Sequence, residues 1–399
     1  MHAVTLVLSG AVHTYYLDQQ MDAMLTMTGV PNEVERSEDV TRRQKKPLVR
    51  RMAADHSQQV RRVVQLAFLL LNAWIGIQFV LWVRYFESLG GLAYVERPAG
   101  VDGWLPIAGL MNLRYFLATG TIPAIHPAAM VLLCVFLVSS LLVKKSFCSW
   151  LCPVGTISEY LWKIGRTLIR RSLSLPRSLD FTLRTLKYLL LAFFVFIVFT
   201  MSAAELGGFL ESPFAVIADV KMLDFFRYLS LAGFTVLAGL IVLSIFIQNF
   251  WCRYLCPYGA LMGIVSTASP IKIRRDAQAC IDCGKCNRAC PSHLTVDRLV
   301  QISSVECTGC MECVAVCPAQ YALQLSLPPL NIPMSQNPGL EYVAARWRHR
   351  AVRPRLVAAI LALVLFGLIG AARATGHWQT NISRKIYMRL VPDATNYDH

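Results

Sequence analysis

Long apolar runs separated by strongly charged loops are the first pattern along this chain. A helix crosses about 30 Å of hydrocarbon with roughly 17 to 25 residues, and five runs approach or reach that length. They lie at residues 63–83, 128–143, 188–204, 229–248 and 356–372. The pattern predicts an α-helical integral membrane protein with about five transmembrane helices.

The charges between these runs predict an orientation. Basic residues gather before the first run, after the second run and before the fifth run. Cytoplasmic flanks carry an excess of Lys and Arg, so these segments are predicted to be cytoplasmic. In the loops at 84–127 and 205–230, acidic residues balance or exceed the basic ones, which favours the outer side. We therefore expect a bacterial inner-membrane protein with a cytoplasmic N-terminus and a periplasmic C-terminus.

Composition supports membrane lipid rather than nucleic acid as the partner. Hydrophobic residues make up 55% of the chain and charged residues only 16%, while the net charge is +15. The basic residues flank apolar runs, as expected for a membrane protein, so the charge does not indicate nucleic-acid binding. An apolar stretch at residues 3–12 lacks the basic segment of a signal peptide, and the irregular region before Thr41 suggests a translation start further in.

A nine-residue pattern occurs twice, as FCSWLCPVG at 147–155 and WCRYLCPYG at 251–259. Each copy follows a run that passes from outside to inside, so two parallel two-helix repeats are the simplest account. A pseudo-two-fold axis along the membrane normal would bring both CxxxCP motifs together on the cytoplasmic face. Within each motif, cysteines at i and i+4 are expected on one face of a helix.

Eight other cysteines follow the C-x2-C-x2-C-x3-C-P spacing of bacterial ferredoxins, in which three thiolates bind one cube and the fourth reaches the neighbouring cube. The predicted ligands are Cys280, Cys283, Cys286 and Cys317 for the first 4Fe-4S cluster, and Cys307, Cys310, Cys313 and Cys290 for the second. A pair of zinc ribbons is the alternative, but ribbons place their CxxC units well apart. The spacing predicts a small α+β ferredoxin domain with two clusters.

The CxxxCP cysteines, Cys148, Cys152, Cys252 and Cys256, leave several roles open. Four thiols brought together could bind a metal or a further cluster, or cycle as disulfides. Packing at a helix end or acylation is the alternative. Duplication of both cysteines and both prolines favours a redox or metal role. Cys134 has no partner at a useful spacing and is interpreted as packing.

The outer loops offer four weaker candidates. His126 and His377 could approach each other and ligate haem or a metal, or could simply be separate interfacial histidines. Asp219 and Lys221, near Asp224, could handle a quinone or its protons, or belong to a solvated loop.

Two further outer segments are amphipathic or apolar without being long enough to span. Residues 104–116 are predicted to lie in the membrane interface. Residues 383–390 are predicted to lie on the outer membrane surface or to dock a partner.

Two CxxxCP motifs at helix ends, followed by two ferredoxin motifs, resemble the membrane ferredoxins that include the NapH quinol dehydrogenase subunit, the membrane half of NosR and the oxidase-assembly protein CcoG. The resemblance covers residues 60–375. It implies electron transfer between a cytoplasmic or quinone-pool donor and a membrane or periplasmic redox partner such as a cytochrome or reductase. The chain would then be a quinol dehydrogenase-like subunit rather than a stand-alone enzyme.

The chain departs from these relatives in lacking an outer flavin-attachment domain and an outer immunoglobulin-like domain, and in having a fifth helix. Two other functions stay open: an assembly factor that reduces a metal or disulfide for a respiratory complex, and a redox-responsive regulator. The regulator is less favoured because no signalling domain is visible.

The predicted organisation has seven parts. They are a cytoplasmic basic segment (1–62), two membrane repeats (63–160 and 161–270), the ferredoxin domain (271–330), a cytoplasmic basic linker (331–355), the fifth helix (356–372) and a periplasmic tail (373–399).

Overall fold

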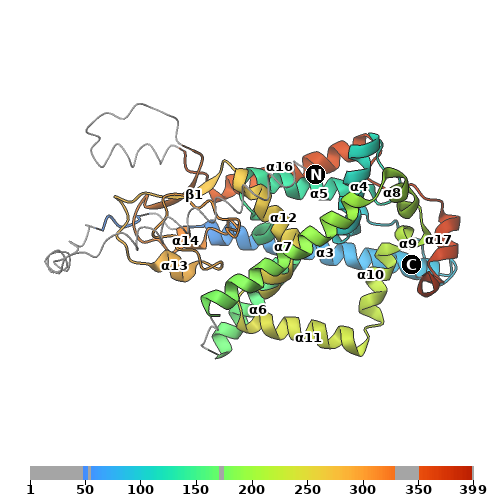
Figure 1. Ribbon diagram of the computed structural model, residues 1–399, viewed down its shortest axis with the longest axis horizontal. Helices are drawn as coiled ribbons and strands as arrows, with labels where there is room; N and C mark the ends of the chain where they lie inside the picture. Colours follow the sequence, from blue (N-terminus) through green and yellow to red (C-terminus); the bar gives the residue numbers. More distant parts are fainter. Residues whose placement is uncertain (1–47, 53–54, 170–174, 329–349, 398–399) are drawn as a thin grey trace. The chain divides into compact units, whose positions relative to one another are not determined.

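The computed structural model describes residues 48–52, 55–169, 175–328 and 350–397 (Figure 1). The elements below all belong to the unit Arg50–His399. Most of the predicted basic segment at 1–62 and most of the linker at 331–355 lie outside the described residues.

Three helices are long and apolar enough to cross a membrane: α3 (Ser57–Glu87), α7 (Arg177–Thr200) and α16 (Pro354–Ala374). Helices α10 (Ala218–Arg227) and α11 (Leu231–Phe246) meet these criteria only together, with a bend of 83° between them. The described residues thus contain three candidate spans, or four if the bent pair crosses as one. The helical membrane fold is confirmed, while five spans remain a prediction.

The second predicted span corresponds to α5 (Pro127–Leu142), which has 16 residues. At 1.5 Å per residue it covers about 24 Å, less than the hydrocarbon thickness. The third span ends at Thr200, earlier than predicted, because Ser202 and Glu205 form a capping box that begins α8 (Ala203–Leu210). A short helix, α9 (Pro213–Val216), follows.

The segment predicted for the membrane interface forms η1 (Ala99–Trp104) and helix α4 (Pro106–Thr119). Gly120, with a φ of 72°, ends α4 in the left-handed conformation that favours glycine. A side chain at Gly109 would lie 2.8 Å from the carbonyl oxygen of Ala129, so glycine permits α4 to pack directly on α5. The helix is thus packed against the rest of the fold.

The two CxxxCP motifs lie in equivalent surroundings. Each begins in a π-helical turn, η2 (Phe147–Leu151) or η3 (Trp251–Leu255), and each leads into a helix, α6 (Pro153–Ile169) or α12 (Pro257–Val265). Helix α6 packs on α11, and α12 packs on α5; α3 contacts η2, and α7 contacts η3. This reciprocal contact pattern is the one expected of two repeats related by a two-fold axis.

The ferredoxin region is built on a two-stranded antiparallel sheet. Strand β1 (Lys272–Arg275) pairs with β2 (Leu323–Ser326), with Lys272 opposite Ser326 and Arg275 opposite Leu323. Two short helices, α13 (Lys285–Ala289) and α14 (Glu312–Ala315), lie between the strands in sequence and contact each other. A short turn, η4 (Ser266–Ala268), connects α12 to this region.

One apolar core joins the membrane helices to the ferredoxin region. It includes Trp150 from the first CxxxCP motif, Ile273 and Leu325 from the sheet, and Val357 and Leu361 from α16. The ferredoxin region is therefore packed into the membrane unit rather than tethered as a free domain. Figure 1 shows α16 and α5 running side by side, which agrees with their contacts.

The C-terminal amphipathic run forms α17 (Arg384–Leu390), followed by η5 (Ala394–Asn396). Two of its side chains pack within the chain: Tyr387 lies 5.0 Å from Trp82 and 5.7 Å from Phe86 between ring centres, and Leu390 is buried in the same cluster. Ile386 of the same helix is exposed. That this run lies on the outer membrane surface or docks a partner stays a prediction.

Candidate iron-sulfur sites

The cysteines of the first ferredoxin motif meet the last cysteine of the second motif. Cys280, Cys283, Cys286 and Cys317 line one small cavity beside Asp297. Gly284, with a φ of 65°, allows the tight turn that starts α13 and places Cys286 on it. Burial raises the pKa of Cys286 to about 11, with additional repulsion from Asp297, Cys280 and Cys317.

The remaining four cysteines form a second, more buried group. Cys290, Cys307, Cys310 and Cys313 are all less than one-tenth exposed. Burial, followed by repulsion from Cys310, Cys307 and Cys290, raises the pKa of Cys313 well above its usual range. The structure thus groups the cysteines as the spacing predicts, with the fourth cysteine of each motif beside the other motif.

The donor set fits a cluster better than a single ion. A tetrahedral zinc ion with Zn–S distances of about 2.3 Å would hold its sulfurs about 3.8 Å apart. Among the described residues, which include every cysteine, no three thiols have sulfurs within 4.8 Å of one another. Backbone N–H groups also donate to the sulfurs, for example Gly309 to Cys307 and Glu312 to Cys310, and such bonds favour thiolates.

The geometry within each CxxxCP motif differs from the prediction. Cys148 lies in a π-helical turn, but Cys152 has extended backbone, with φ −68° and ψ 120°. Cys256 likewise has φ −75° and ψ 105°. The following proline disfavours helical backbone at the residue before it, so the helix breaks at the second cysteine. The two cysteines of a motif therefore do not share one α-helix face.

The second cysteine instead caps the next helix. The backbone N–H of Gly259 donates to the sulfur of Cys256 at 3.2 Å, and Gly155 donates likewise to Cys152. A side chain at Gly155 would lie only 2.3 Å from the carbonyl oxygen of Cys148. Glycine in the motif lets the chain return close to the first cysteine, so both thiols of a motif stay on the same side.

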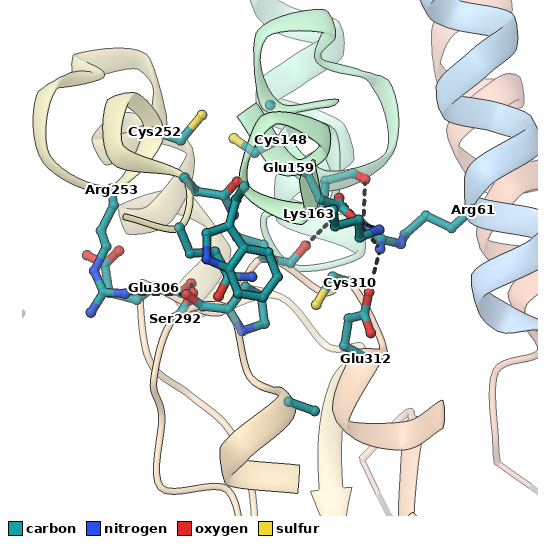
Figure 2. Close-up of a pocket in the computed structure, with 18 of the residues that line it drawn as sticks. Arg61, Cys148, Glu159, Lys163, Cys252, Arg253, Ser292, Glu306, Cys310 and Glu312 are labelled. Atoms are coloured by element: carbon teal, nitrogen blue, oxygen red, sulfur yellow. Dashed lines mark hydrogen bonds and ion pairs between the residues drawn. The ribbon is translucent and has the colours of Figure 1, made fainter. Parts of the chain in front are cut away.

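The four CxxxCP cysteines converge, as the repeat predicts. Figure 2 shows the thiols of Cys148 and Cys252 facing each other. Burial, followed by repulsion from Cys152, Cys256 and Cys148, raises the pKa of Cys252. Burial also raises the pKa of Cys148 to about 12 and that of Cys152 to about 11. We refer to these four residues as the thiol tetrad.

A buried ammonium group, which sequence analysis did not single out, lies beside the tetrad. Lys145 is 3% exposed and forms no ion pair with any carboxylate in the described residues. Burial would lower the pKa of Lys145, but the charges of Glu306 and of Cys148, Cys256 and Cys252 raise it. Glu306 also interacts with Lys187 and offsets the charge of Lys145 only in part, so the position of Lys145 favours negative charge on the tetrad. In the sequence, Lys145 can be noticed only as a lysine that directly follows an apolar run. The equivalent position of the second repeat holds Asn249.

The first CxxxCP motif also holds the second ferredoxin motif directly. The indole N–H of Trp150 donates to the Gly309 carbonyl at 3.3 Å, and the Ser149 hydroxyl donates to the Thr308 carbonyl at 2.6 Å. Gly309 and Thr308 lie between Cys307 and Cys310. The thiol tetrad and the second cysteine group are therefore neighbours in the fold.

Two buried ion pairs reinforce this contact. Lys187 of α7 donates to both oxygens of Glu306 at 2.6 and 2.7 Å. Burial alone would raise the pKa of Glu306, but Lys145 and Lys187 outweigh it and lower the pKa to about 2. Arg61 of α3, 2% exposed, bonds both oxygens of Glu159 at 2.8 Å and Glu312 of α14 at 2.8 Å (Figure 2). These long-range pairs are not visible in the sequence pattern.

The outer candidates form a different kind of cluster. Asp102, His126 and Asp219 have ligand atoms within 4.8 Å of one another. The guanidinium of Arg97 already occupies the cation position, bonding Asp102 and lying 2.7 Å from Asp219. The arrangement is therefore an internal ion cluster rather than a metal centre.

Both ring nitrogens of His126 have polar partners within the chain. Its Nδ1 lies 2.9 Å from Asp102, and its Nε2 lies 2.9 Å from the Ala215 carbonyl. The guanidinium of Arg97 also lies 3.1 Å from Nδ1. Burial lowers the pKa of His126, but Asp102 outweighs it and the pKa is raised. His377 is exposed, so the geometry does not support the predicted haem or metal pair.

Asp219 and Lys221 also have separate surroundings. Asp219 is fully buried in the ion cluster, whereas the ammonium of Lys221 lies 5.3 Å from the ring centre of Phe214. Asp224 pairs with Arg227 at 3.3 Å. The predicted joint handling of quinone protons has no shared site here. Cys134 lies within α5 and is partly buried, as expected of a packing residue.

Comparison with known proteins agrees with the cysteine pattern. A family model described as a 4Fe-4S binding domain matches residues 125–176 and again 229–276, and a 4Fe-4S dicluster domain matches residues 272–324. The protein YccM of Escherichia coli, which carries a provisional name as an electron transport protein, is 49% identical to this chain over 339 residues. The matched region covers 85% of this chain and 91% of YccM.

Two further relatives are less similar to this chain. The ferredoxin-type protein NapH of Escherichia coli is 25% identical over 281 residues, covering 65% of this chain and 85% of NapH. The protein NirI of Paracoccus denitrificans is 32% identical over 172 residues, covering 43% of this chain and 24% of NirI. No solved structure matches this chain.

Proposed function

Because this chain belongs to the YccM family of ferredoxin-type 4Fe-4S membrane proteins, we propose that it transfers electrons between a cytoplasmic or quinone-pool donor and a membrane or periplasmic redox partner. The observation that carries this proposal is the direct contact between the first CxxxCP motif, which contributes two cysteines of the thiol tetrad, and the second ferredoxin motif through Trp150 and Ser149. Two neighbouring sets of iron-sulfur ligands are what stepwise electron transfer requires.

The ligand assignment is part of the proposal. Cys280, Cys283, Cys286 and Cys317 would hold one 4Fe-4S cluster, and Cys290, Cys307, Cys310 and Cys313 a second. When bound, such clusters take up and release single electrons. The residues around them exclude water and supply backbone N–H donors, both of which influence the reduction potential.

The tetrad would hold a third centre. Support comes from the match of the 4Fe-4S binding model to both CxxxCP repeats and from the buried Lys145, whose charge compensates an anionic group. The alternative function, an assembly factor that reduces a metal or a disulfide for a respiratory complex, would use the same four cysteines as its working thiols.

Any quinone that exchanges electrons with this chain would meet it near the tetrad rather than at the outer ion cluster. Trp82 lies beside the outer ion cluster, and Arg61 lies beside the ferredoxin region. Both belong to the continuous helix α3, in which Trp82 follows Arg61 by 21 residues. This separation corresponds to about 32 Å. Electron transfer weakens steeply with distance, so the outer cluster is too remote to exchange electrons directly.

The test is iron and sulfide analysis with EPR of the anaerobically purified protein, alone and after addition of ubiquinol or menaquinol. Three cubes correspond to about twelve irons and two cubes to about eight. Changing Cys148→Ser together with Cys252→Ser should remove about four irons and abolish quinol-dependent reduction of the other centres.

Cys134→Ser is the matched control, because this cysteine belongs to none of the three sets, and it should change neither the iron content nor the reduction. Fewer than about seven irons in the parent protein would refute two complete cubes. Unchanged reduction in the double variant would refute the tetrad as an electron relay.

A further inference from the structure

A cavity lies between the thiol tetrad and the ferredoxin region. Its volume is about 540 Å³, within the range of small-molecule sites. Cys148 and Cys252 of the tetrad line it on one side, and Cys310 of the second ferredoxin group lines it on the other. Cys152 and Cys256 do not line it, so it is a space beside the tetrad rather than the space within it.

The cavity has a surplus of positive charge. Seven basic residues line it, against three acidic ones. The three carboxylates are already neutralised, since Glu159 and Glu312 pair with Arg61 and Glu306 pairs with Lys187. Four of the basic residues form no ion pair with a carboxylate in the described part of the chain: Lys145, Arg166, Lys285 and Arg288.

These four cations differ in burial. Lys145 is almost completely buried, while Arg166, Lys285 and Arg288 are exposed at the rim. Glu306, which is shared with Lys187, offsets the buried ammonium of Lys145 only in part. A cavity with such an ammonium and a cationic rim attracts an anion, and guanidinium groups suit phosphate especially well. The charge therefore points to a phosphate-bearing ligand.

The wall also offers an aromatic surface. Trp162 of α6 lines the cavity, and the guanidinium of Arg166 lies 5.4 Å from the centre of its ring. A planar ring can stack on such a surface. Because this wall also adjoins two groups of redox-active cysteines, a planar ligand that itself carries electrons suits the site better than a lipid headgroup or free phosphate.

We propose that this cavity binds a phosphorylated flavin of the flavin mononucleotide class, with its ring against Trp162 and its phosphate at the cationic rim formed by Lys285 and Arg288. The proposal rests on the electron-transfer function above, because it supplies that function with a cytoplasmic redox carrier. Binding itself requires no electron transfer and can be measured separately.

The test is titration of FMN with the purified, oxidised protein, followed by flavin fluorescence and its anisotropy. Riboflavin, which lacks the phosphate, is titrated in parallel. A charge-assisted bond to phosphate corresponds to about tenfold or more in affinity, so riboflavin should bind at least that much more weakly.

Arg288→Gln should weaken FMN binding by about tenfold and leave riboflavin binding unchanged. Arg298→Gln is the matched control, since Arg298 is exposed in the same region but does not line the cavity. Arg288 lies between predicted cluster ligands in the sequence, so Arg288→Gln could bind less FMN because it has lost iron. Arg166→Gln changes the rim at a position far in sequence from the ligands of the two ferredoxin clusters and therefore serves as a second rim variant. Trp162→Leu should weaken both flavins.

The proposal is overturned if FMN does not bind, if riboflavin and FMN bind equally, or if Arg288→Gln with its full iron content behaves like Arg298→Gln. Iron analysis of the same samples separates these outcomes from a failure of the proposed function. A protein with its full iron content that ignores FMN refutes only the flavin site. A protein without the clusters refutes the electron-transfer function.

Discussion

Replacing Arg61 tests how the ferredoxin region is held against the membrane helices. Arg61 of α3 bonds Glu159 of α6 and Glu312 of α14 simultaneously. Arg61→Gln would leave both carboxylates without this partner in a largely buried place. Removing one member of a buried ion pair typically costs about 3 to 5 kcal/mol.

The structure places this variant at the low end of that range. Glu159 retains Lys163 at 2.6 Å and Gln65 at 3.1 Å, and Glu312 is 29% exposed, so water can solvate part of its charge. We expect a loss of about 3 kcal/mol in the free energy of unfolding. For a protein of this size the loss corresponds to a fall in Tm of about 4 °C.

The assay is thermal unfolding of the purified protein in detergent, followed by the visible absorption of its iron-sulfur centres. Arg62→Gln is the matched control, because the neighbouring Arg62 is exposed and bonds only the Gln58 carbonyl at 3.2 Å. Adding Glu159→Gln and Glu312→Gln to Arg61→Gln should recover part of the loss, since the stranded charges are then gone. Equal Tm values for Arg61→Gln and Arg62→Gln, or no recovery, would contradict the reasoning.

Three further predictions concern other parts of the fold. Gly155→Ala should displace the first CxxxCP motif, cost about 1 to 3 kcal/mol and lower the iron content, because its Cβ would lie 2.3 Å from the Cys148 carbonyl. In Gly259→Ala the nearest atom is 3.5 Å away, so stability should be unchanged or rise by about 0.4 to 1 kcal/mol; equal losses in both would be inconsistent with the geometry. The pKa of His126 is raised in the folded protein, so the stability it contributes is present below about pH 6.5 and is lost as the pH rises through that raised pKa. His126→Gln should abolish this alkaline loss in thermal unfolding at pH 6 and pH 9, whereas the exposed control His377→Gln should keep it; a similar loss in His126→Gln would show that another group titrates. Tyr387→Phe should change the Tm little or raise it, because the buried hydroxyl has no hydrogen-bond partner among the described residues, while Tyr387→Ala should cost about 3 to 5 kcal/mol. A large loss in the phenylalanine variant would show that the hydroxyl is bonded.

Local patterns in the sequence determined a large part of this protein. Apolar runs predict helices from composition alone, and α3 and α16 enclose the predicted runs 63–83 and 356–372. The ferredoxin spacing is equally local, since it reflects how far a few residues can reach around a cluster. The break of the helix at Cys152 and Cys256 could also have been predicted from the sequence, because a proline restricts the backbone of the residue before it. The expectation of one helix face overlooked that rule.

Only the tertiary structure decided which distant groups became partners. Arg97 and Asp219 are separated by 122 positions, and Arg61 and Glu312 by 251, yet each pair meets in a buried ion pair. The same holds for Lys145, which is an ordinary flanking lysine in the sequence and a buried cation beside four thiols in the fold. Tyr387 of the C-terminal helix likewise packs on Trp82 of α3, a contact that the sequence pattern does not show. Spacing along the chain governs contacts within a turn or a motif, whereas buried charges and aromatic rings find their partners only when packing excludes the water that would otherwise solvate them.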